Sequence, residues 1–138
     1  MLERKIKNQL IDWKKDKNKM CLMIKGARQV GKTYIIREFA KESYKYFIEI
    51  NFDLNEKYKE MFSEALDAET IMKQITLYFP EAEFIPGETI IFLDEIQNCP
   101  RAVTALKFLA KNERFDVIAS RIVTTVLTIR TTRFQVYR

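Results

Sequence analysis

The chain has 138 residues, 47% of them apolar, and is long enough for one domain with a buried core. It contains no histidine, which excludes Ser-His and Cys-His catalytic groups and histidine metal sites. Its two cysteines, Cys21 and Cys99, give neither a disulfide framework nor a metal-ligand spacing. No apolar run is long enough to cross a membrane and the first residues lack the apolar segment of a signal peptide. We therefore expect a cytoplasmic protein with no membrane partner.

The net charge of +5 is concentrated at the two ends of the chain. Residues 1–20 carry seven basic and three acidic side chains, and residues 121–138 carry four arginines and no acid. Between these ends, thirteen basic residues stand against sixteen acidic ones. One hypothesis is therefore that the basic ends bind nucleic acid. A solvated helix face is the simpler explanation for the first of them.

The first elements are a helix and a strand. A helix is predicted over residues 1–18, because apolar side chains recur there at helical spacing, at Leu2, Ile6, Leu10 and Trp13. Residues 20–25 are mostly apolar and predict a buried strand. From Thr33 onward the pattern is typical of an amphipathic helix with Ile36, Phe39 and Ala40 on one side.

Between that strand and that helix, residues 26–33 fit the pattern G-x-x-x-x-G-K-[ST], the phosphate-binding loop of nucleoside triphosphatases. The two glycines permit a tight loop whose N–H groups surround a phosphate, and the positive end of the following helix adds to the attraction. Lys32 would contact the β and γ phosphates, and the Thr33 hydroxyl would coordinate Mg²⁺. A turn without a ligand is the alternative, but it explains neither the spacing nor the Lys-Thr pair. The predicted cofactor-binding residues are Gly26, Ala27, Arg28, Gln29, Val30, Gly31, Lys32, Thr33 and Tyr34.

The middle of the chain continues the alternation of strands and helices. Residues 46–51 predict a second strand, in which Glu49 indicates a position at or near the sheet edge. A helical stripe follows at Tyr58, Met61, Phe62 and Ala65. Asp67 is expected to cap a further helix, which carries Ile71, Ile75 and Tyr78 and which Pro80 terminates.

Residues 89–93 are continuously apolar, as in a strand buried on both faces of a parallel sheet, and they end in Asp94-Glu95. The carboxyl ends of such strands form the ligand-binding edge of open α/β folds. Asp94 would hold Mg²⁺, directly or through water, and Glu95 would orient the water that attacks the γ-phosphate. Glu95 and Lys32 are thus the predicted catalytic residues. Because the chain has no Asn-Lys-x-Asp motif for guanine, we expect ATP as the nucleotide.

The last predicted elements are a helix with Pro100 in its first turn and a strand over residues 115–119 that ends at Ser120. Strands and helices alternate throughout this part of the chain. The sequence therefore predicts an α/β fold, a parallel sheet with helices on both faces.

Three segments resemble the ATPase core of the prokaryotic AAA-type family: residues 26–33, Asn51-Phe52-Asp53 and Leu93-Asp94-Glu95-Ile96-Gln97. More narrowly, they are similar to the subgroup that has an extra C-terminal domain. The resemblance implies that the strand ending at Ser120 lies between the phosphate-loop strand and the Asp94 strand. It also implies that Ser120 lies near the polar position that senses the γ-phosphate.

The resemblance covers about residues 1–120, and the chain then changes character. We therefore expect an ATPase core over residues 1–120 and a divergent, basic, threonine-rich tail over residues 121–138. The family's fifth core strand, helical lid, arginine finger and C-terminal domain have no counterpart here, which implies an incomplete core and weak hydrolysis. A truncated or frameshifted gene product is the favoured explanation, and a short natural protein whose tail forms an edge strand is the alternative.

Three functions follow from these patterns. The leading one is an ATPase core that binds Mg·ATP, and the second is a nucleotide-binding or inactive fragment without turnover. The third is a nucleic-acid-binding module. We also expect self-association, because an uncovered sheet edge lies beside a tail of high β propensity.

Overall fold

The structure is a computed structural model that describes residues 2–26, 31–122 and 128–133. Its helices are α1 (Leu2–Lys15), α2 (Lys32–Ser43), α3 (Ala68–Tyr78) and α4 (Pro100–Leu109), with two 3-10 helices, η1 (Glu56–Phe62) and η2 (Ile96–Asn98). The strands are β1 (Leu22–Gly26), β2 (Tyr46–Asn51), β3 (Thr89–Asp94), β4 (Asp116–Ile122) and β5 (Thr128–Arg133). No helix within these ranges is long and apolar enough to cross a lipid bilayer.

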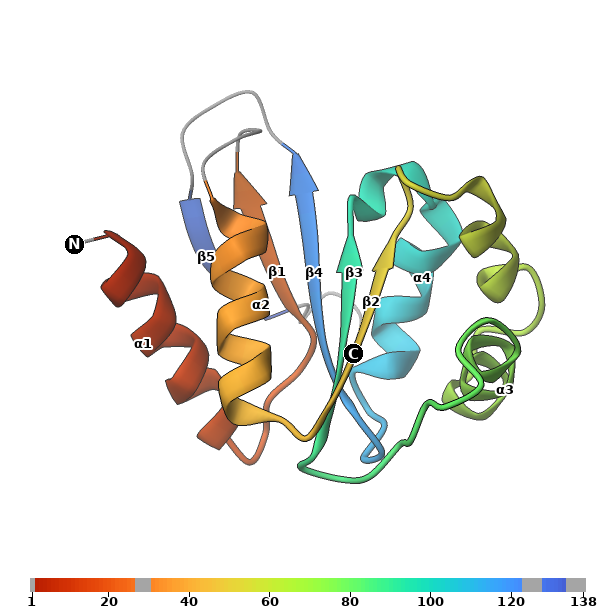
Figure 1. The fold of residues 1–138 in the computed structure, drawn as a ribbon, viewed down its shortest axis with the longest axis horizontal. Coiled ribbons are helices and arrows are strands. Elements are labelled where there is room, and N and C mark those ends of the chain that lie inside the picture. Colours follow the sequence, from red (N-terminus) through yellow and green to blue (C-terminus); the bar gives the residue numbers. More distant parts are fainter. Residues whose placement is uncertain (1, 27–30, 123–127, 134–138) are drawn as a thin grey trace.

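One sheet organises the molecule, with the strand order β2-β3-β4-β1-β5 (Figure 1). Strands β2, β3, β4 and β1 are parallel, which confirms the predicted parallel α/β sheet for these four strands. The predicted strand order around Ser120 is confirmed as well, because β4 lies between β1 and β3. Strand β2 is at the edge, as Glu49 in its sequence indicated.

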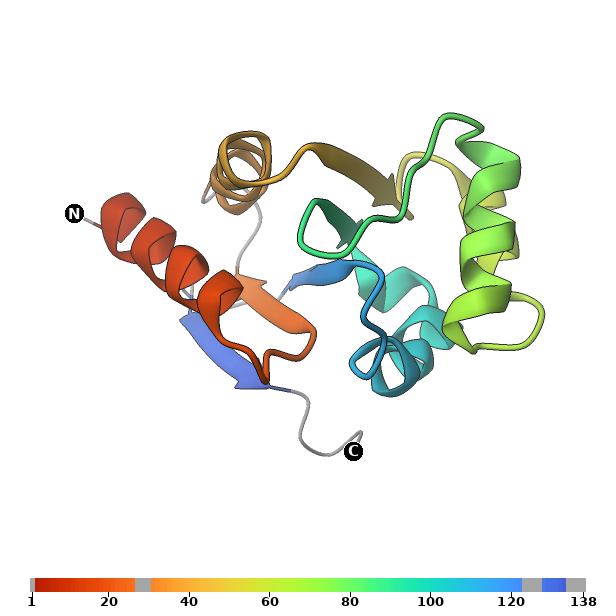
Figure 2. The ribbon, with the colours of Figure 1, turned by 90° about the horizontal axis from the view of Figure 1, so that it is seen from below.

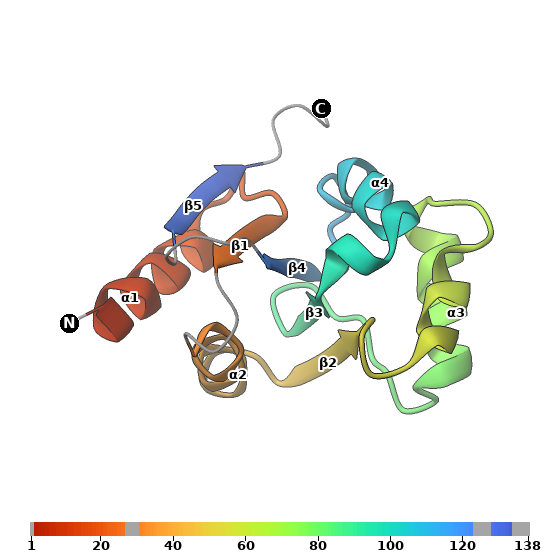
Figure 3. The same ribbon diagram turned by 90° about the horizontal axis from the view of Figure 1, so that it is seen from above.

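Side-chain alternation along the strands divides the core into two layers. Leu22 and Ile24 of β1 pack toward α1 and α2, whereas Met23 packs toward α3, α4 and η1. Figure 3 shows α1 and α2 on one side of the sheet and α3 and α4 on the other. The predicted arrangement with helices on both faces is therefore confirmed.

The amphipathic pattern of each helix explains its position. Ile6, Leu10 and Trp13 of α1 are buried, and the Trp13 Nε1 donates a 2.8 Å hydrogen bond to the Met20 carbonyl that fixes the turn into β1. Helix α1 ends at Lys15 rather than at residue 18. In α3, the Asp67 side chain accepts a hydrogen bond from the Thr70 N–H, so the predicted N-cap is confirmed.

The structure differs from the prediction for the segment before α3. The spacing of Tyr58, Met61, Phe62 and Ala65 predicted an α-helical stripe, but the backbone forms the 3-10 helix η1, which ends at Phe62. Ala65 is exposed and Tyr58 is half-buried, so the residues of the predicted stripe that are fully buried are Met61 and Phe62. The tighter helix and the turn at Ser63, whose hydroxyl donates to the Glu60 carbonyl, bring them onto the core.

The sheet is mixed rather than entirely parallel. Strand β5 pairs antiparallel with β1 and lies beside it in Figure 2. A tail that forms an edge strand was the alternative prediction for this segment, and the structure has such an edge strand. Strand β4 also continues past Ser120 to Ile122. The division of the chain into a core of residues 1–120 and a separate tail stays a prediction.

Candidate functional site

The predicted site residues converge at the carboxyl end of the parallel strands. Gly26 is the last residue of β1, Asn51 ends β2 and Asp94 ends β3, while Ser120 lies close to the end of β4. The arrows of these strands point to the same edge of the sheet in Figure 1. Helix α2 begins at that edge with Lys32.

The structure describes both ends of the phosphate-loop motif, Gly26 and residues 31–33. Gly31 has φ 80°, a left-handed conformation that glycine adopts without strain, and it immediately precedes α2. Its carbonyl accepts the Ile35 N–H at 3.1 Å, the first helical bond. The other predicted loop residues, Ala27, Arg28, Gln29 and Val30, lie outside the described residues.

Lys32 is only 6% exposed, and its ammonium group connects the ends of two strands. The Nζ donates to the Gly26 carbonyl at 3.3 Å and to the Arg121 carbonyl at 3.1 Å. These bonds hold the positive charge at the carboxyl edge of the sheet, between β1 and β4. A phosphate at this edge would meet an ammonium group that is already in place.

The Asp94 carboxylate is the centre of a polar cluster. Its Oδ1 accepts a short hydrogen bond from the Ser120 hydroxyl, and its Oδ2 accepts from the Asn51 Nδ2 at 3.2 Å. The Thr33 hydroxyl is 3.5 Å from the same Oδ2. Asp94 is only 2% exposed, so loss of hydration raises its pKa, and the Ser120 hydrogen bond opposes that rise.

The Thr33 hydroxyl and the Asp94 carboxylate are suitable donors for Mg²⁺. Both are hard oxygen donors, and Mg²⁺ binds typically through one or two protein groups while phosphate oxygens and water complete its shell. The described residues contain no group of three or more Asp, Glu, Cys or His side chains that would form a closed cage. The two donors therefore fit an ion that is shared with a phosphate.

Glu95 is placed by an unusual backbone conformation. Its φ of 57° and ψ of 46° are left-handed, and it is the one non-glycine residue with positive φ in the described part of the chain. Its N–H donates to the Ser120 hydroxyl oxygen at 3.2 Å. Its Oε1 accepts from the Gln97 Nε2 at 2.8 Å, so Asp94 and Glu95 project differently although they are adjacent.

Comparison with known proteins identifies the family and the fold. The family model described as "AAA domain" matches residues 18–127, most of the chain. The chain belongs to the AAA domain family. The fold is similar to that of the solved structure of PCH-2 from C. elegans, with a TM-score of 0.54 and 14% identity. The match covers 92% of this chain but only 38% of that one. No curated protein matches.

Membership in the AAA domain family confirms the predicted resemblance, and the fold is that of a nucleotide-binding P-loop ATPase core. The family match extends seven residues beyond Ser120, into the predicted tail. The individual roles predicted for Lys32, Thr33, Asp94 and Glu95 remain predictions, but the structure brings these residues together at one edge.

Ser120 makes two hydrogen bonds within the candidate site of this AAA domain. The side chain is fully buried, and its hydroxyl donates to Asp94 and accepts from the Glu95 N–H. Its one proton is therefore directed toward Asp94. The predicted sensing role is not tested by this geometry, whereas a contact that orients the Asp94-Glu95 pair is observed.

Two residues at the site had no predicted role. Asn51 and Gln97 belong to the segments that carry the family resemblance, but only the structure reveals their contacts with Asp94 and Glu95. Asn51 also accepts the N–H groups of Asp53 and Leu54, which stabilises the turn after β2. An amide at the carboxyl end of a strand beside the Asp94 strand is the signal that could have identified Asn51.

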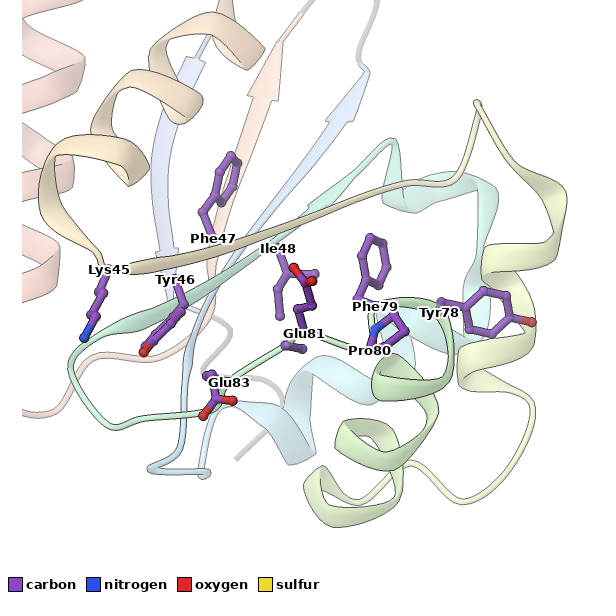
Figure 4. Close-up of a pocket in the computed structure, with 10 residues that line it drawn as sticks. Lys45, Tyr46, Phe47, Ile48, Tyr78, Phe79, Pro80, Glu81 and Glu83 are labelled. Atoms are coloured by element: carbon purple, nitrogen blue, oxygen red, sulfur yellow. The ribbon is translucent and has the colours of Figure 1, made fainter.

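A cavity of about 590 Å³ lies away from the edge of the sheet that carries the candidate site. It is lined by the first residues of β2 and by the segment after α3, from Lys45 to Ile48 and from Tyr78 to Glu83 (Figure 4). Because β2 starts there, this cavity is at the amino end of the strand. In open α/β sheets, ligands bind at the opposite end. It is therefore not part of the candidate site of the AAA domain.

Proposed function

We propose that this AAA domain binds Mg·ATP at the carboxyl edge of its sheet and hydrolyses it with Glu95 as the residue that orients the attacking water. The observation that supports this proposal best is the convergence of four predicted side chains. Lys32 and Thr33 begin α2, Asp94 ends β3 and Glu95 follows it, and the Thr33 hydroxyl is 3.5 Å from the Asp94 carboxylate.

Each residue has a distinct role in this proposal. The Lys32 ammonium, now bonded to two backbone carbonyls, has three N–H donors and can turn toward the β and γ phosphates. Thr33 and Asp94 would hold Mg²⁺, whose charge offsets the negative charge of the phosphates. Ser120 and Asn51 fix the orientation of the Asp94 carboxylate.

In this proposal, the role of Glu95 determines whether bound ATP is hydrolysed or only held. A glutamate beside the metal-binding aspartate is well placed to polarise water. However, its Oε1 is hydrogen-bonded to Gln97, which supports a second candidate function, nucleotide binding without turnover, if that bond persists when ATP is bound. Steady-state release of phosphate distinguishes the two candidates.

The first experiment is a calorimetric titration of Mg·ATP into the wild-type protein and the Lys32→Ala variant. Hydrogen bonds to charged groups contribute about 1.5–3 kcal/mol, roughly twice as much as neutral ones, so we expect affinity to fall by about 10- to 150-fold. Lys73→Ala is the matched control, because this lysine lies exposed on α3, away from the site. Equal affinity of wild type and Lys32→Ala would overturn the assignment.

The same proteins and a Glu95→Gln variant are then assayed for phosphate release. If Glu95 orients the water, the variant keeps its ATP affinity while the rate falls by about 10²–10⁴-fold. Glu113→Gln, a substitution of an exposed glutamate outside the site, should change neither. A wild-type protein that binds ATP but releases no phosphate would favour the second candidate function.

A further inference from the structure

The cavity of about 590 Å³ at the amino end of β2 has two walls. One wall is β2 from Lys45 to Ile48, and the other is the segment from Tyr78 to Glu83 that follows α3. Because side chains alternate along a strand, Ile48 packs in the core layer of α3, whereas Phe47 packs against the layer of α1 and α2. Figure 4 shows Tyr46 and Ile48 on the side of β2 that faces the second wall. The cavity therefore lies mainly on the α3 side of the sheet.

Both walls are held by contacts within the protein. The fully buried Thr89 of β3 donates its hydroxyl to the Glu83 carbonyl at 2.7 Å, which ties the segment after α3 to the sheet. Phe79 packs against the Tyr58 ring with centroids 5.6 Å apart, and Tyr58 also contacts the Tyr78 ring edge-on. Aromatic rings in a tethered wall are typical of a binding site that is formed before its ligand arrives.

The charge of this cavity is opposite to that of the whole chain, whose net charge is +5. Glu81 and Glu83 line it, and Lys45 is the one basic residue among its lining residues. The Lys45 ammonium group lies over the Tyr46 ring, 5.4 Å from its centroid. Within the described residues, no ion pair joins either carboxylate to a basic side chain. The two glutamates are therefore available to a cationic group from outside.

A second cavity of about 420 Å³ continues this surface past Tyr78, which lines both cavities. Glu60, Glu64 and Leu77 are among its lining residues, and none of its lining residues is basic. Leu77 is 72% exposed, and the Tyr78 hydroxyl donates to the Glu60 carboxylate at 2.8 Å. We call the residues that line the two cavities the acidic surface. It is elongated, and it combines carboxylates with aromatic and aliphatic side chains.

Strand β2 adds main-chain groups to the acidic surface. In a parallel ladder, alternate residues direct both their N–H and C=O groups to the neighbouring strand. The Tyr46 N–H donates to the Glu88 carbonyl and the Phe52 N–H to the Asp94 carbonyl, so even-numbered residues face β3. Phe47 therefore directs its N–H and C=O away from β3, at the edge of the described sheet. An extended chain can form hydrogen bonds with such groups.

We propose that the acidic surface docks an extended segment of a partner protein that presents arginine or lysine side chains between apolar ones. The aliphatic stems of these side chains pack on the aromatic rings, and their charged ends reach the carboxylates. The same carboxylates repel the phosphates of a nucleic acid. The elongated shape and the main-chain groups of Phe47 suit a polypeptide better than a compact cation. This contact is independent of the proposed function, because the nucleotide would bind at the opposite end of the strands.

The test is fluorescence anisotropy on the nucleotide-free protein with two labelled hexapeptides, one of alternating arginine and valine and one of alternating glutamate and valine. The wild type should bind the arginine peptide only. Glu81→Gln/Glu83→Gln keeps the shape of both side chains but removes their charge, so its affinity for this peptide should fall by about 2- to 30-fold. Added salt should reduce this difference. The matched control, Glu3→Gln/Asp12→Asn, removes two exposed carboxylates of α1 on the other side of the sheet and should bind like the wild type.

Three results would overturn the proposal. They are equal binding of the arginine peptide by the wild type and by Glu81→Gln/Glu83→Gln, equal binding of the two peptides by the wild type, and binding of neither peptide. Light scattering examines a second copy of this chain as the occupant. An oligomer that dissociates in Glu81→Gln/Glu83→Gln but not in the control would assign the surface to a second copy and also overturn the proposal. Each of these outcomes leaves the proposed function intact, because Mg·ATP is absent from the test.

Discussion

At the scale of single residues, Asp94 is subject to opposing demands. Its carboxylate needs a negative charge to bind a metal ion, yet it is almost completely buried, which disfavours that charge. The hydrogen bonds from Ser120 and Asn51 compensate in part for the lost hydration. The buried carboxylate therefore lowers the stability of the ligand-free protein, and a bound cation would offset this cost if Asp94 holds Mg²⁺ as proposed.

This conflict predicts a specific dependence of stability on pH. Because the pKa of Asp94 is raised in the folded protein, the folded state retains this proton at pH values where the unfolded chain has released it. The free energy of unfolding therefore falls as the pH rises from about 4, the ordinary aspartate pKa, through the raised value. Asp94→Asn removes this contribution.

Urea unfolding of wild type and Asp94→Asn between pH 4 and 7 measures the effect. The stability of the wild type relative to the variant should decrease as the pH rises, and become constant above the raised pKa. A relative stability that increases with pH would show that the carboxylate is better stabilised in the folded protein than in water.

Ser120→Ala distinguishes the orienting contact from the predicted sensing role. The substitution leaves the Asp94 Oδ1 and the Glu95 N–H without their hydroxyl partner in a buried place, which costs about 1–3 kcal/mol. We expect the ligand-free protein to melt several degrees lower in a thermal scan. A pure sensor would lower the rate of phosphate release and leave the melting temperature of the ligand-free protein unchanged.

At the scale of secondary-structure elements, the sequence predicts best those features that depend only on neighbouring residues. The continuous apolar run of β3 and the cap at Asp67 could each be identified from neighbouring residues alone. The 3-10 geometry of η1 could not, because the spacing of its apolar residues fits either type of helix. The antiparallel pairing of β5 depends on a partner about a hundred residues away.

The same difference between local patterns and long-range alignment applies to the candidate site. The residues predicted to contact phosphate and metal lie in motifs whose spacing is fixed by the backbone, so the sequence alone could predict them. The contacts of Asn51 and Gln97 depend on how neighbouring strands and turns align, such as the register that places Asn51 opposite Asp94. No local pattern encodes that alignment.

The cap of α3 gives a prediction at this scale. The Asp67 side chain accepts the Thr70 N–H at 3.0 Å, and its other oxygen accepts the Thr70 hydroxyl at 2.7 Å. Asp67→Ala should lower the free energy of unfolding by about 0.5–2 kcal/mol. Because α3 lies away from the strand ends that form the site, ATP affinity should not change. Asp67→Asn, which retains a capping oxygen, should lose less stability in the same urea titration.

At the scale of the whole molecule, the sheet has two edges of different character. At one edge, Glu49 of β2 forms a two-point ion pair with Arg37 of α2, at 2.7 and 2.6 Å. Charged side chains on an edge strand oppose pairing with another sheet. At the other edge, β5 covers β1. Removing β5 would therefore expose the backbone of the strand that leads into the phosphate loop.

Deletion of residues 123–138 tests the predicted division between core and tail. This deletion keeps Arg121, whose carbonyl contacts Lys32, and removes β5. If the tail is separate from the nucleotide-binding fold, oligomeric size measured by light scattering should change much more than ATP affinity. Loss of ATP binding would show that β5 completes the core sheet.

The left-handed backbone at Glu95 has a consequence for how sequences at this position can vary. A glycine would adopt the same conformation with about 1–2 kcal/mol less strain. In a library of variants selected for thermal survival alone, position 95 should therefore become enriched in glycine. In a library selected for phosphate release, it should retain glutamate. The residue at position 95 would thus distinguish two populations that share the same fold. The population with glycine would be more stable but inactive, and the population with glutamate would be less stable but active.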